Sequence, residues 1–297
     1  VPIIMGANIG TTVTCALVSL GHMTRREEFR RAMSGALVHD FFNLLAVAIL
    51  LPVELLTARI WGQGVLERLA TGLTGLLSGA EGVKYTSPLK SALKWAANLV
   101  VNPVAGWCGD TPGGRIEAGV IVLAVALALL FGMLLLMTRI MRQVLRGRAE
   151  KVLDQTIGRS AILGMTVGMV ITAIVQSSSA TTSLLVPLAG AGILTVEQIF
   201  PITLGANVGT TVTALLASLA AGRPAGLTIA LVHLLFNASG IALIYPVPQV
   251  RRLPIRAARW MAGLAAESKR YAFGFILGLF FVVPGLLILV SKLLKLA

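Results

Sequence analysis

A 15-residue pattern occurs twice in this chain, and no other feature of the sequence restricts its fold as strongly. Residues 6–20 read GANIGTTVTCALVSL and residues 205–219 read GANVGTTVTALLASL, with 11 identities. Each copy continues into the motif H-x-x-F-N and then, after an apolar run, into a proline; these positions are His39-Phe42-Asn43 with Pro52, and His233-Phe236-Asn237 with Pro246. Composition alone does not produce a duplicated pattern of this length, so we expect a fold made of two related halves.

Long apolar runs place the chain among helical membrane proteins. Hydrophobic residues make up 56% of the sequence and charged residues 12%, against about 25% charged residues in a typical soluble domain. The apolar runs are continuous rather than alternating, which argues against a membrane barrel and favours an all-α integral membrane fold. The clearest span is 116–138, and further spans are expected at 36–56, 226–247 and 271–291.

Three apolar segments are interrupted by small or polar residues. Segments 1–22 and 198–221 contain the repeated Gly, Asn and Thr residues, so we expect interrupted transmembrane helices that unwind there. Segment 161–195 is too long for one span and carries QSSSATTS at its centre, which predicts a re-entrant helical hairpin that enters and leaves on one side. Such backbone is tolerated only where protein or a water-filled cavity surrounds it.

The formal charge of +13 is concentrated in three short segments. Of the 25 Lys and Arg residues, 16 lie in the linkers 23–33, 139–160 and 248–270. The positive-inside rule puts these linkers in the cytoplasm, which predicts a multi-pass protein of the plasma (inner) membrane with an extracytoplasmic link at 57–115. A soluble nucleic-acid binder, which the charge alone would suggest, is excluded by the hydrophobic composition.

Under this orientation the two copies cross the membrane in opposite directions. Span 36–56 runs outward and span 226–247 runs inward, which predicts inverted-topology repeats. Inverted repeats with interrupted helices are typical of secondary transporters, in which substrates bind near the membrane midplane. A channel or exporter built on the same duplication is the alternative interpretation.

The repeat also predicts how the chain is divided. The QSSS hairpin precedes the second copy, and the offset of 199 residues places its counterpart 23 residues before Val1, so we expect an N-terminally truncated chain. The predicted units are 1–56, a first inverted repeat whose QSSS hairpin is missing; 57–115, the link; 116–160, a transmembrane helix and a cytoplasmic linker; 161–247, the second repeat with its hairpin; and 248–297, a cytoplasmic basic segment and a C-terminal span.

The polar residues at the centre of the hairpin can bind an anion. Four of them lie where the helix breaks: Gln176, Ser177, Ser178 and Ser179. The helix that follows a break begins with free N–H groups and the positive end of its dipole, and serine hydroxyls add further donors. Because the hairpin contains no Lys or Arg, a bound oxyanion needs a co-bound cation to balance its charge.

The G-A-N-x-G-T-T-x-T segments suit a cation such as Na⁺. Glycines allow the helix to unwind and free carbonyl oxygens, and neighbouring side chains add neutral amide and hydroxyl oxygens. The candidate sodium ligands are Asn8 and Thr11 in the first copy, and Asn207, Thr210 and Thr213 in the second. Alternatively, the hydroxyls bond only to the backbone of their own helix, as is common in membrane helices.

Asp40 is the only acid in an otherwise apolar span interior. A carboxylate at the centre of a membrane helix costs about 2.5–3.5 kcal/mol on insertion scales, so it usually binds an ion or pairs with a base. Its counterpart in the second copy is Leu234, which favours a role outside the repeat, such as an extra cation site. His39 and His233 lie beside aromatic residues and are expected to be packed and hydrogen-bonded rather than to relay protons.

A membrane hydrolase is a further possibility, with one of Ser177–Ser179 as nucleophile and a histidine as base. No G-x-S-x-G elbow surrounds these serines and nothing in the sequence pairs a histidine with them, so we expect that the protein is not an enzyme. Cys15 and Cys108 fit neither a disulfide framework nor a metal site, so Na⁺ is the only metal expected and no organic cofactor is predicted.

The combined motifs resemble those of the type II sodium-dependent phosphate cotransporter family. QSSS and GANVGTT, together with GANIGTTVT, EFRRAMSGALVHDFFN and YPVPQVRRLPIRAA, extend the similarity over most of the chain outside 57–115. The resemblance implies a symporter that moves inorganic phosphate into the cell by alternating access, with Na⁺ as coupling ion and the lipid bilayer as surroundings. Animal members carry a large disulfide-bonded loop between the repeats, whereas 57–115 is short and holds only Cys108, which indicates a prokaryotic member.

The same resemblance implies roles for individual residues. In that family both QSSS hairpins enclose phosphate with sodium sites built around them, so residues 176–179 would contact phosphate and the first two would also contact sodium. Thr210 and Thr213 would complete a sodium site, with Thr11 as the first-copy counterpart of Thr210. Electrogenic relatives have an aspartate at the position of Asp40 that supports an additional sodium ion, which implies electrogenic transport here.

Overall fold

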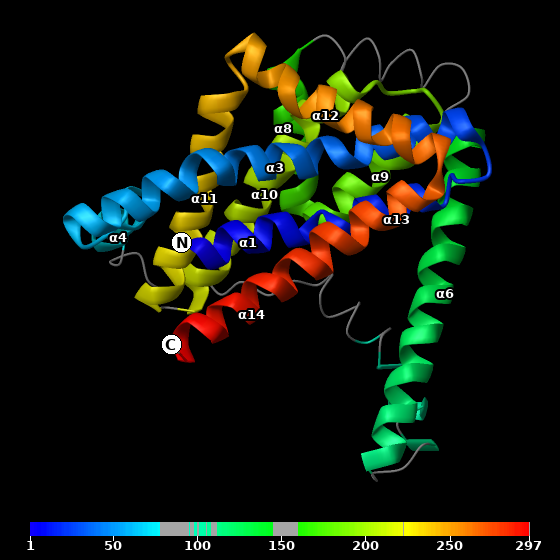
Figure 1. The fold of residues 1–297 in the computed structure, drawn as a ribbon, viewed down its shortest axis with the longest axis horizontal. Helices are drawn as coiled ribbons and strands as arrows, with labels where there is room; N and C mark the ends of the chain where they lie inside the picture. Colours follow the sequence, from blue (N-terminus) through cyan, green and yellow to red (C-terminus); the bar gives the residue numbers. More distant parts are fainter. Residues whose placement is uncertain are drawn as a thin grey trace. The chain divides into compact units, whose positions relative to one another are not determined.

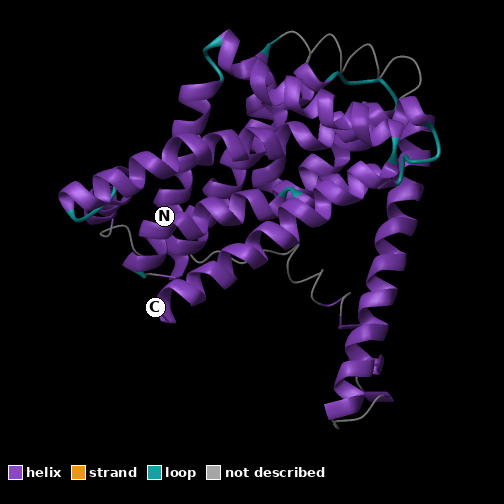
Figure 2. Ribbon diagram, viewed as in Figure 1, coloured by secondary structure: helices purple, strands orange, loops and turns teal. Residues whose placement is uncertain are grey.

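The computed structural model describes residues 1–77, short pieces between 95 and 107, and residues 112–144, 160–221 and 223–296. Every regular element in these ranges is a helix (Figure 2). By length and composition, five of the described helices can cross a membrane: Pro2–Leu20, Arg26–Trp61, Val196–Leu219, Pro224–Ile244 and Lys269–Leu289. The predicted all-α class is therefore confirmed, and the apolar helices support the prediction of a membrane protein.

The helices follow one another along the chain as Figure 1 shows. They are α1 (Pro2–Thr11), α2 (Val13–Leu20), α3 (Arg26–Trp61), α4 (Val65–Leu77), α6 (Pro112–Val144), α8 (Ala161–Val175), α9 (Ser178–Gly190), α10 (Val196–Ala221), α11 (Pro224–Ile244), α12 (Pro248–Glu267), α13 (Lys269–Leu277), a π-helical turn (Gly278–Val282) and α14 (Val283–Leu296). The chain divides into two compact units, Val1–Val83 with Leu145–Ala297, and Lys84–Val144. All candidate site residues belong to the first unit.

The long helix α6 is the main described element of the second unit. It contains 33 residues, which at 1.5 Å per residue gives a length of about 50 Å. It includes the whole predicted span 116–138 and begins at Pro112, inside the predicted link 57–115. Cys108 lies outside the described residues. So do residues 145–159, which make up most of the predicted linker 139–160.

Two of the basic segments that the sequence presented as linkers are mostly helical. Residues 26–33 form the first turns of α3, where Glu27 pairs with Arg30 at 2.8 Å and Glu28 pairs with Arg25 at 2.8 Å. Acidic residues in the first turn also suit the positive end of the helix dipole. The predicted span 36–56 is therefore the interior of a longer helix, which ends at Gly62 in the left-handed conformation with φ of 76°.

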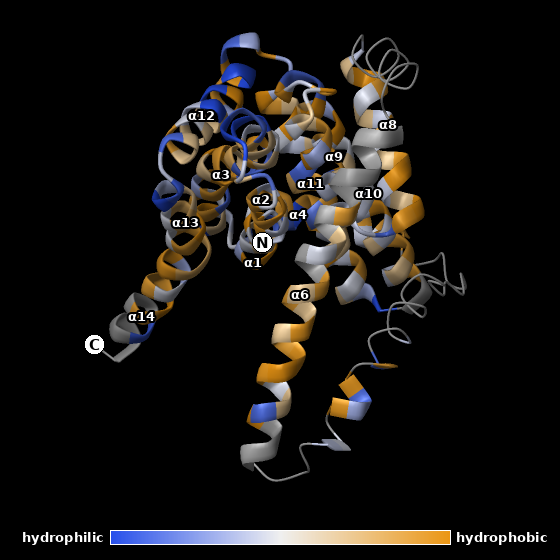
Figure 3. Ribbon diagram, turned by 90° about the vertical axis from the view of Figure 1, so that its right-hand side faces the viewer, coloured by the Kyte–Doolittle hydropathy of each residue, from blue (hydrophilic) through white to orange (hydrophobic). Residues whose placement is uncertain are grey.

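Helix α12 forms the second of these basic segments and is amphipathic. Its apolar side, which includes Ile255, Ala258 and Met261, is buried and packs along α3. Arg252, Arg256 and Arg259 of this helix are exposed, and Figure 3 shows hydrophilic residues concentrated on and around α12. Amphipathic basic helices of this kind are typical of membrane surfaces.

Helices α8 and α10 pack closely through glycines. A Cβ atom at Gly168 would overlap the carbonyl of Ile202, and a Cβ atom at Gly205 would overlap the carbonyl of Met165. Gly164 and Gly168 on α8, like Gly205 and Gly209 on α10, stand four residues apart on one face of their helix. This small-xxx-small pattern lets two membrane helices approach until their backbones touch.

The expected interruption of the second copy at 198–221 is wrong. Helix α10 runs unbroken from Val196 to Ala221, because its glycines serve this close packing rather than unwinding. The first copy is interrupted as expected, at the single turn residue Thr12 between α1 and α2. Gly6 and Gly10, the counterparts of Gly205 and Gly209, are exposed, and an added Cβ atom would meet no described residue within 4 Å.

No sequence pattern indicates the corner between α3 and α4. The buried carboxylate of Glu54 accepts hydrogen bonds from the backbone N–H groups of Leu66, at 2.9 Å, and Glu67, at 3.2 Å. These are orphan donors of the first turn of α4, so Glu54 caps that helix from a neighbouring one. A Cβ atom at Gly64 would overlap this carboxylate, so a larger residue there would make Glu54 move away from its cap.

Candidate functional site

The helix break predicted inside 161–195 lies within QSSS. Helix α8 ends at Val175, and Gln176 adopts the left-handed conformation with φ of 59° and ψ of 27°. It is the only described non-glycine residue with positive φ, a conformation that costs about 1–2 kcal/mol for a residue with a Cβ atom. Ser177 then caps α9 by accepting a hydrogen bond from the N–H of Ala180 at 3.2 Å. Strain held at such a point is common at functional sites.

The break presents neutral hydrogen-bond donors. The first turn of α9 has N–H groups without carbonyl partners inside the helix, and Gln176 and the three serines are partly exposed. Residues 161–190 contain no Lys or Arg, so the positive end of the α9 dipole is the positive field that the hairpin itself supplies. This arrangement can bind an oxyanion.

Threonines fix the two arms of the hairpin to each other and to the first copy. The hydroxyl of Thr172 on α8 donates to that of Thr181 on α9 at 3.0 Å. Thr182 donates to the carbonyl of Ser178 at 2.7 Å and accepts a bond from the Cys15 thiol of α2 at 3.1 Å. The break is therefore held in place from both sides.

The tip of the hairpin reaches the interruption of the first copy. The hydroxyl of Ser179 lies 3.5 Å from the carbonyl oxygen of Thr11, its hydrogen-bond acceptor. Thr11 is the last residue of α1, and Thr12 follows as the turn to α2. The structure thus brings together QSSS and Thr11, which the sequence placed in one site although they are 168 residues apart.

Asp40 lies beside this junction, on α3. Its side chain is fully buried, and neither carboxylate oxygen has a hydrogen-bond partner among the described residues. The carboxylate lies close to the Thr12 hydroxyl and within electrostatic range of the Cys15 thiol, but the Thr12 hydroxyl donates to the carbonyl of Ile9 at 2.7 Å. A buried carboxylate without a partner is costly, so this group fits a bound cation.

Thr210 and Thr213 lie on the unbroken part of α10. Their hydroxyls donate to the carbonyls of Ala206, at 3.2 Å, and Thr210, at 2.8 Å, which is the alternative that the sequence left open. The close approaches of Gly205 to Met165 and of Gly209 to Met169 define a register that places Thr213 beside the last turn of α8. Each hydroxyl oxygen keeps a lone pair for an ion, so their sodium role stays a prediction.

The two asparagines form hydrogen bonds that cross between the copies. His39 Nε2 lies 2.8 Å from Asn207 Oδ1, and His233 Nε2 lies 3.2 Å from Asn8 Oδ1. Each histidine thus pairs with the asparagine of the other copy and donates from Nε2, since an amide oxygen only accepts. The expectation of packed, hydrogen-bonded histidines is confirmed, while the cross-pairing was not foreseen.

The asparagines of the H-x-x-F-N motifs extend this network. Asn43 Nδ2 donates to the backbone carbonyl of Asn8 at 2.8 Å, and Asn237 Nδ2 donates to that of Asn207 at 3.4 Å. Asn207 Nδ2 also donates to Asn43 Oδ1 at 3.2 Å. The amide of Asn207 is engaged on both sides, which favours a bracing role; its role as a sodium ligand, like that of Asn8, stays a prediction.

Comparison with known proteins shows which sequences this chain is similar to. Residues 128–266 match the sequence model of a family described as Na⁺/Pi-cotransporter. The chain is 33% identical over 346 aligned positions to sodium-dependent phosphate transport protein 2A of Ovis aries, and 34% identical over 361 positions to protein 2B of Homo sapiens. Both alignments cover 96% of this chain.

The chain spans about half the length of these curated relatives, 54% of the ovine protein and 52% of the human one. Protein 2C of Rattus norvegicus is 32% identical over 354 positions, which cover 96% of this chain and 58% of the relative. No solved structure matches the chain. The similarity therefore extends over nearly all of this chain and over part of each relative.

Proposed function

We propose that this chain is a member of the Na⁺/Pi-cotransporter family and carries out sodium-coupled symport of inorganic phosphate. Nearly all of it aligns with sodium-dependent phosphate transport proteins, at 33% and 34% identity to the ovine and human relatives. The structural observation that carries the proposal is a helix break without Lys or Arg at QSSS, together with the buried carboxylate of Asp40, which has no hydrogen-bond partner among the described residues. The first feature suits an anion and the second suits a cation, as coupling requires.

Phosphate would bind at the N-terminus of α9. Its oxygens would accept hydrogen bonds from free N–H groups of the first turn, from the serine hydroxyls at 177–179 and from the amide of Gln176. The left-handed backbone at Gln176 supports this assignment, because it ends α8 there and lets a new helix begin at Ser178. Neutral donors bind phosphate without holding it as tightly as arginines would, which suits a substrate that must be released.

Sodium would bind between the hairpin and the first copy. Asp40 supplies a carboxylate, and the carbonyl of Thr11 lies at the point where the hairpin tip touches α1. Thr210 and Thr213 add hydroxyl oxygens from α10, and Gln176 and Ser177 contribute from the hairpin. A carboxylate that gains a cation loses its desolvation cost, so sodium binding would stabilise the packed form of the site. Asp40 would make the cycle electrogenic.

Alternating access would rest on the two copies moving relative to each other. The reciprocal His–Asn bonds join them and give two equivalent points of contact. In the second copy, Gly205 and Gly209 pack against α8 of the QSSS hairpin. The matching Gly6 and Gly10 of α1 contact no described residue, which supports the prediction of a corresponding hairpin for the first copy. We place the protein in the plasma (inner) membrane with the basic segments in the cytoplasm.

The contacts in the structure distinguish cation-coupled transport from the two alternative functions, an anion channel or exporter and a serine hydrolase. An anion channel or exporter could use the same hairpin, but it would not require the unpartnered carboxylate at Asp40. A serine hydrolase needs a histidine beside a serine, whereas His39 and His233 both pair with asparagines of the other copy. The contacts of the described residues therefore favour transport coupled to a cation.

Uptake into liposomes tests the proposal directly. The reconstituted protein should accumulate labelled phosphate when an inward sodium gradient is applied and should not when potassium replaces sodium. Gln176→Ala should raise the sodium concentration needed for half-maximal uptake. The control is Thr166→Ala, since Thr166 is an exposed residue of α8, the helix that ends before Gln176, and its hydroxyl donates only to the carbonyl of Ile162 one turn earlier. Uptake that ignores the sodium gradient would overturn the symporter.

A further inference from the structure

A polar cavity lies beside the start of α3, at the opposite end of α9 from the QSSS break. It has a volume of about 280 Å³. Arg30, Arg31 and Ser34 of α3 and Arg259 of α12 line it, together with Gly192, Leu194, Thr195 and Val196 at the turn from α9 into α10. The arginines come from α3 and α12, segments that are more than 200 residues apart in the sequence. The fold thus brings three guanidinium groups to one hollow.

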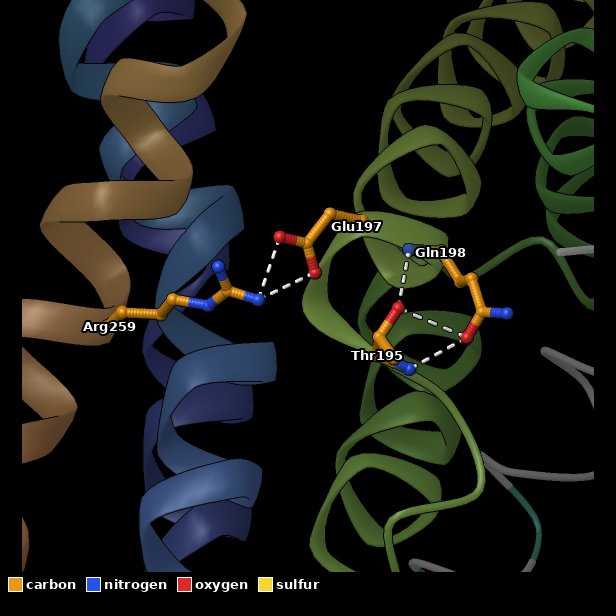
Figure 4. Close-up of polar contacts among 4 residues, drawn as sticks. All are labelled: Thr195, Glu197, Gln198 and Arg259. Carbon is orange, nitrogen blue, oxygen red and sulfur yellow. Dashed lines mark hydrogen bonds and ion pairs between the residues drawn. The ribbon is translucent and has the colours of Figure 1, made fainter.

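The positive charge of this cavity is only partly balanced. Arg31 Nε donates to the backbone carbonyl of Gly190 at 3.1 Å, a neutral acceptor that leaves its charge in place. Arg30 pairs with Glu27, and Arg259 pairs with Glu197 at 2.7 Å, between side chains that are about half exposed. Figure 4 shows Arg259 reaching from α12 across to Glu197. Exposed pairs of this kind are weak, so both arginines can turn to a better anion.

The N-terminus of α10 adds to this field. Thr195 caps the helix, since its backbone N–H donates to Gln198 Oε1 at 2.8 Å and its hydroxyl receives a bond from the Gln198 N–H at 3.4 Å (Figure 4). Val196, the first residue of α10, lines the cavity. The positive end of a 26-residue helix therefore points to the place where the three arginines converge.

The surroundings of the cavity are those of a membrane surface. Helix α12 carries exposed arginines beside its buried apolar residues, and its other exposed residues include Trp260, at 65% exposure, and Leu253, at 49%. Tryptophans and basic residues on such a helix are typical of the boundary between lipid headgroups and acyl chains. Basic pockets between helices at this level bind the phosphate of anionic headgroups.

We infer that the Arg30–Arg31–Arg259 cavity binds a phosphate group at the membrane surface. Guanidinium groups match two phosphate oxygens at once, and the hydroxyls of Ser34 and Thr195 offer further polar contacts. The phosphate is presented by an anionic phospholipid or arrives as free phosphate. The site is separate from the QSSS break, which lies at the other end of α9, and its occupancy does not depend on whether the protein transports phosphate.

Binding to the purified chain in detergent tests this inference. The probe is a fluorescent short-chain phosphatidylglycerol, with phosphatidylcholine as the neutral lipid, and its affinity is measured by anisotropy. Arg31→Gln and Arg259→Gln should each weaken phosphatidylglycerol binding by about tenfold, because each removes charged hydrogen bonds to the ligand. The matched control is Arg252→Gln on the same α12, an exposed arginine that does not line the cavity, which should change the affinity less than twofold.

A variant that is expected to strengthen phosphatidylglycerol binding distinguishes an effect on binding from an effect on folding. Glu197→Gln removes the carboxylate that competes for Arg259 and should tighten phosphatidylglycerol binding, which a purely structural role would not produce. Equal losses in Arg31→Gln and Arg252→Gln, or weaker binding in Glu197→Gln, would overturn the site. Competition with inorganic phosphate in a Gln176→Ala background identifies the source: displacement assigns free phosphate, and its absence assigns the headgroup.

Discussion

At the scale of single residues, the role of a buried acid depends on its hydrogen-bond partners. Asp40 and Glu54 both lie in α3 and are both buried, yet only Glu54 has partners, the two N–H groups that open α4. The carboxylate of Glu54 completes a helix end, whereas that of Asp40 has no described hydrogen-bond partner. The sequence singled out Asp40 by its place in an apolar run, and it could not reveal Glu54, because a cap from another helix leaves no local pattern.

Replacing Asp40 by asparagine removes the charge and keeps the shape. We expect Asp40→Asn to retain phosphate uptake while the charge moved per phosphate falls, since the side chain no longer favours a cation. Current and labelled uptake, measured on the same vesicles, give this ratio. The control is Leu234→Asn, which introduces the same amide at the matching position of the second copy and should leave the ratio unchanged. An unaltered ratio in Asp40→Asn would refute a sodium site there.

At the scale of helices, the same repeated glycines have different neighbours. Gly205 and Gly209 touch the backbone of α8, whereas Gly6 and Gly10 face no described residue. A motif read as a place to unwind is, in the second copy, a surface for helix packing. A helix break lies at Gln176, within the QSSS motif where the polar residues predicted it.

Paired alanine substitutions test this difference. Gly205→Ala should destabilise the chain by about 1–3 kcal/mol, because the new methyl group has no room against Met165. Gly6→Ala at the equivalent position should be neutral or stabilise α1 by up to about 1 kcal/mol, through helix propensity. Thermal unfolding in detergent measures both. Equal destabilisation in this chain would show that α1 is packed as α10 is, contrary to the structure.

At the scale of the whole molecule, the two copies are tied together by a few buried polar groups. His39 bonds Asn207 and His233 bonds Asn8, so each bond joins one copy to the other. The motifs were visible in the sequence, but sequence patterns do not tell which histidine meets which asparagine. A bond inside each copy and a bond between copies produce the same repeated motif.

A double-mutant cycle distinguishes these two pairings. His39→Ala and Asn207→Ala should show a coupling energy of about 0.5–3 kcal/mol in unfolding, since each removes the partner of the other. His39→Ala combined with Asn8→Ala should be nearly additive, because that pair has no hydrogen bond in the structure. Conversely, coupling of His39 to Asn8 alone would mean that the copies are not cross-linked as described. His39→Gln, which keeps a donor, should recover part of the loss.

The sequence by itself determined the class of this protein, the duplicated motifs and the position of the helix break, because hydrophobic length and local polarity are read residue by residue. It did not determine which helix the glycines meet, which asparagine each histidine bonds, or that arginines from α3 and α12 share a cavity. Those facts depend on contacts between segments far apart in the chain. Only the packing of the helices decides such contacts, since many partners are compatible with one motif until their backbones approach.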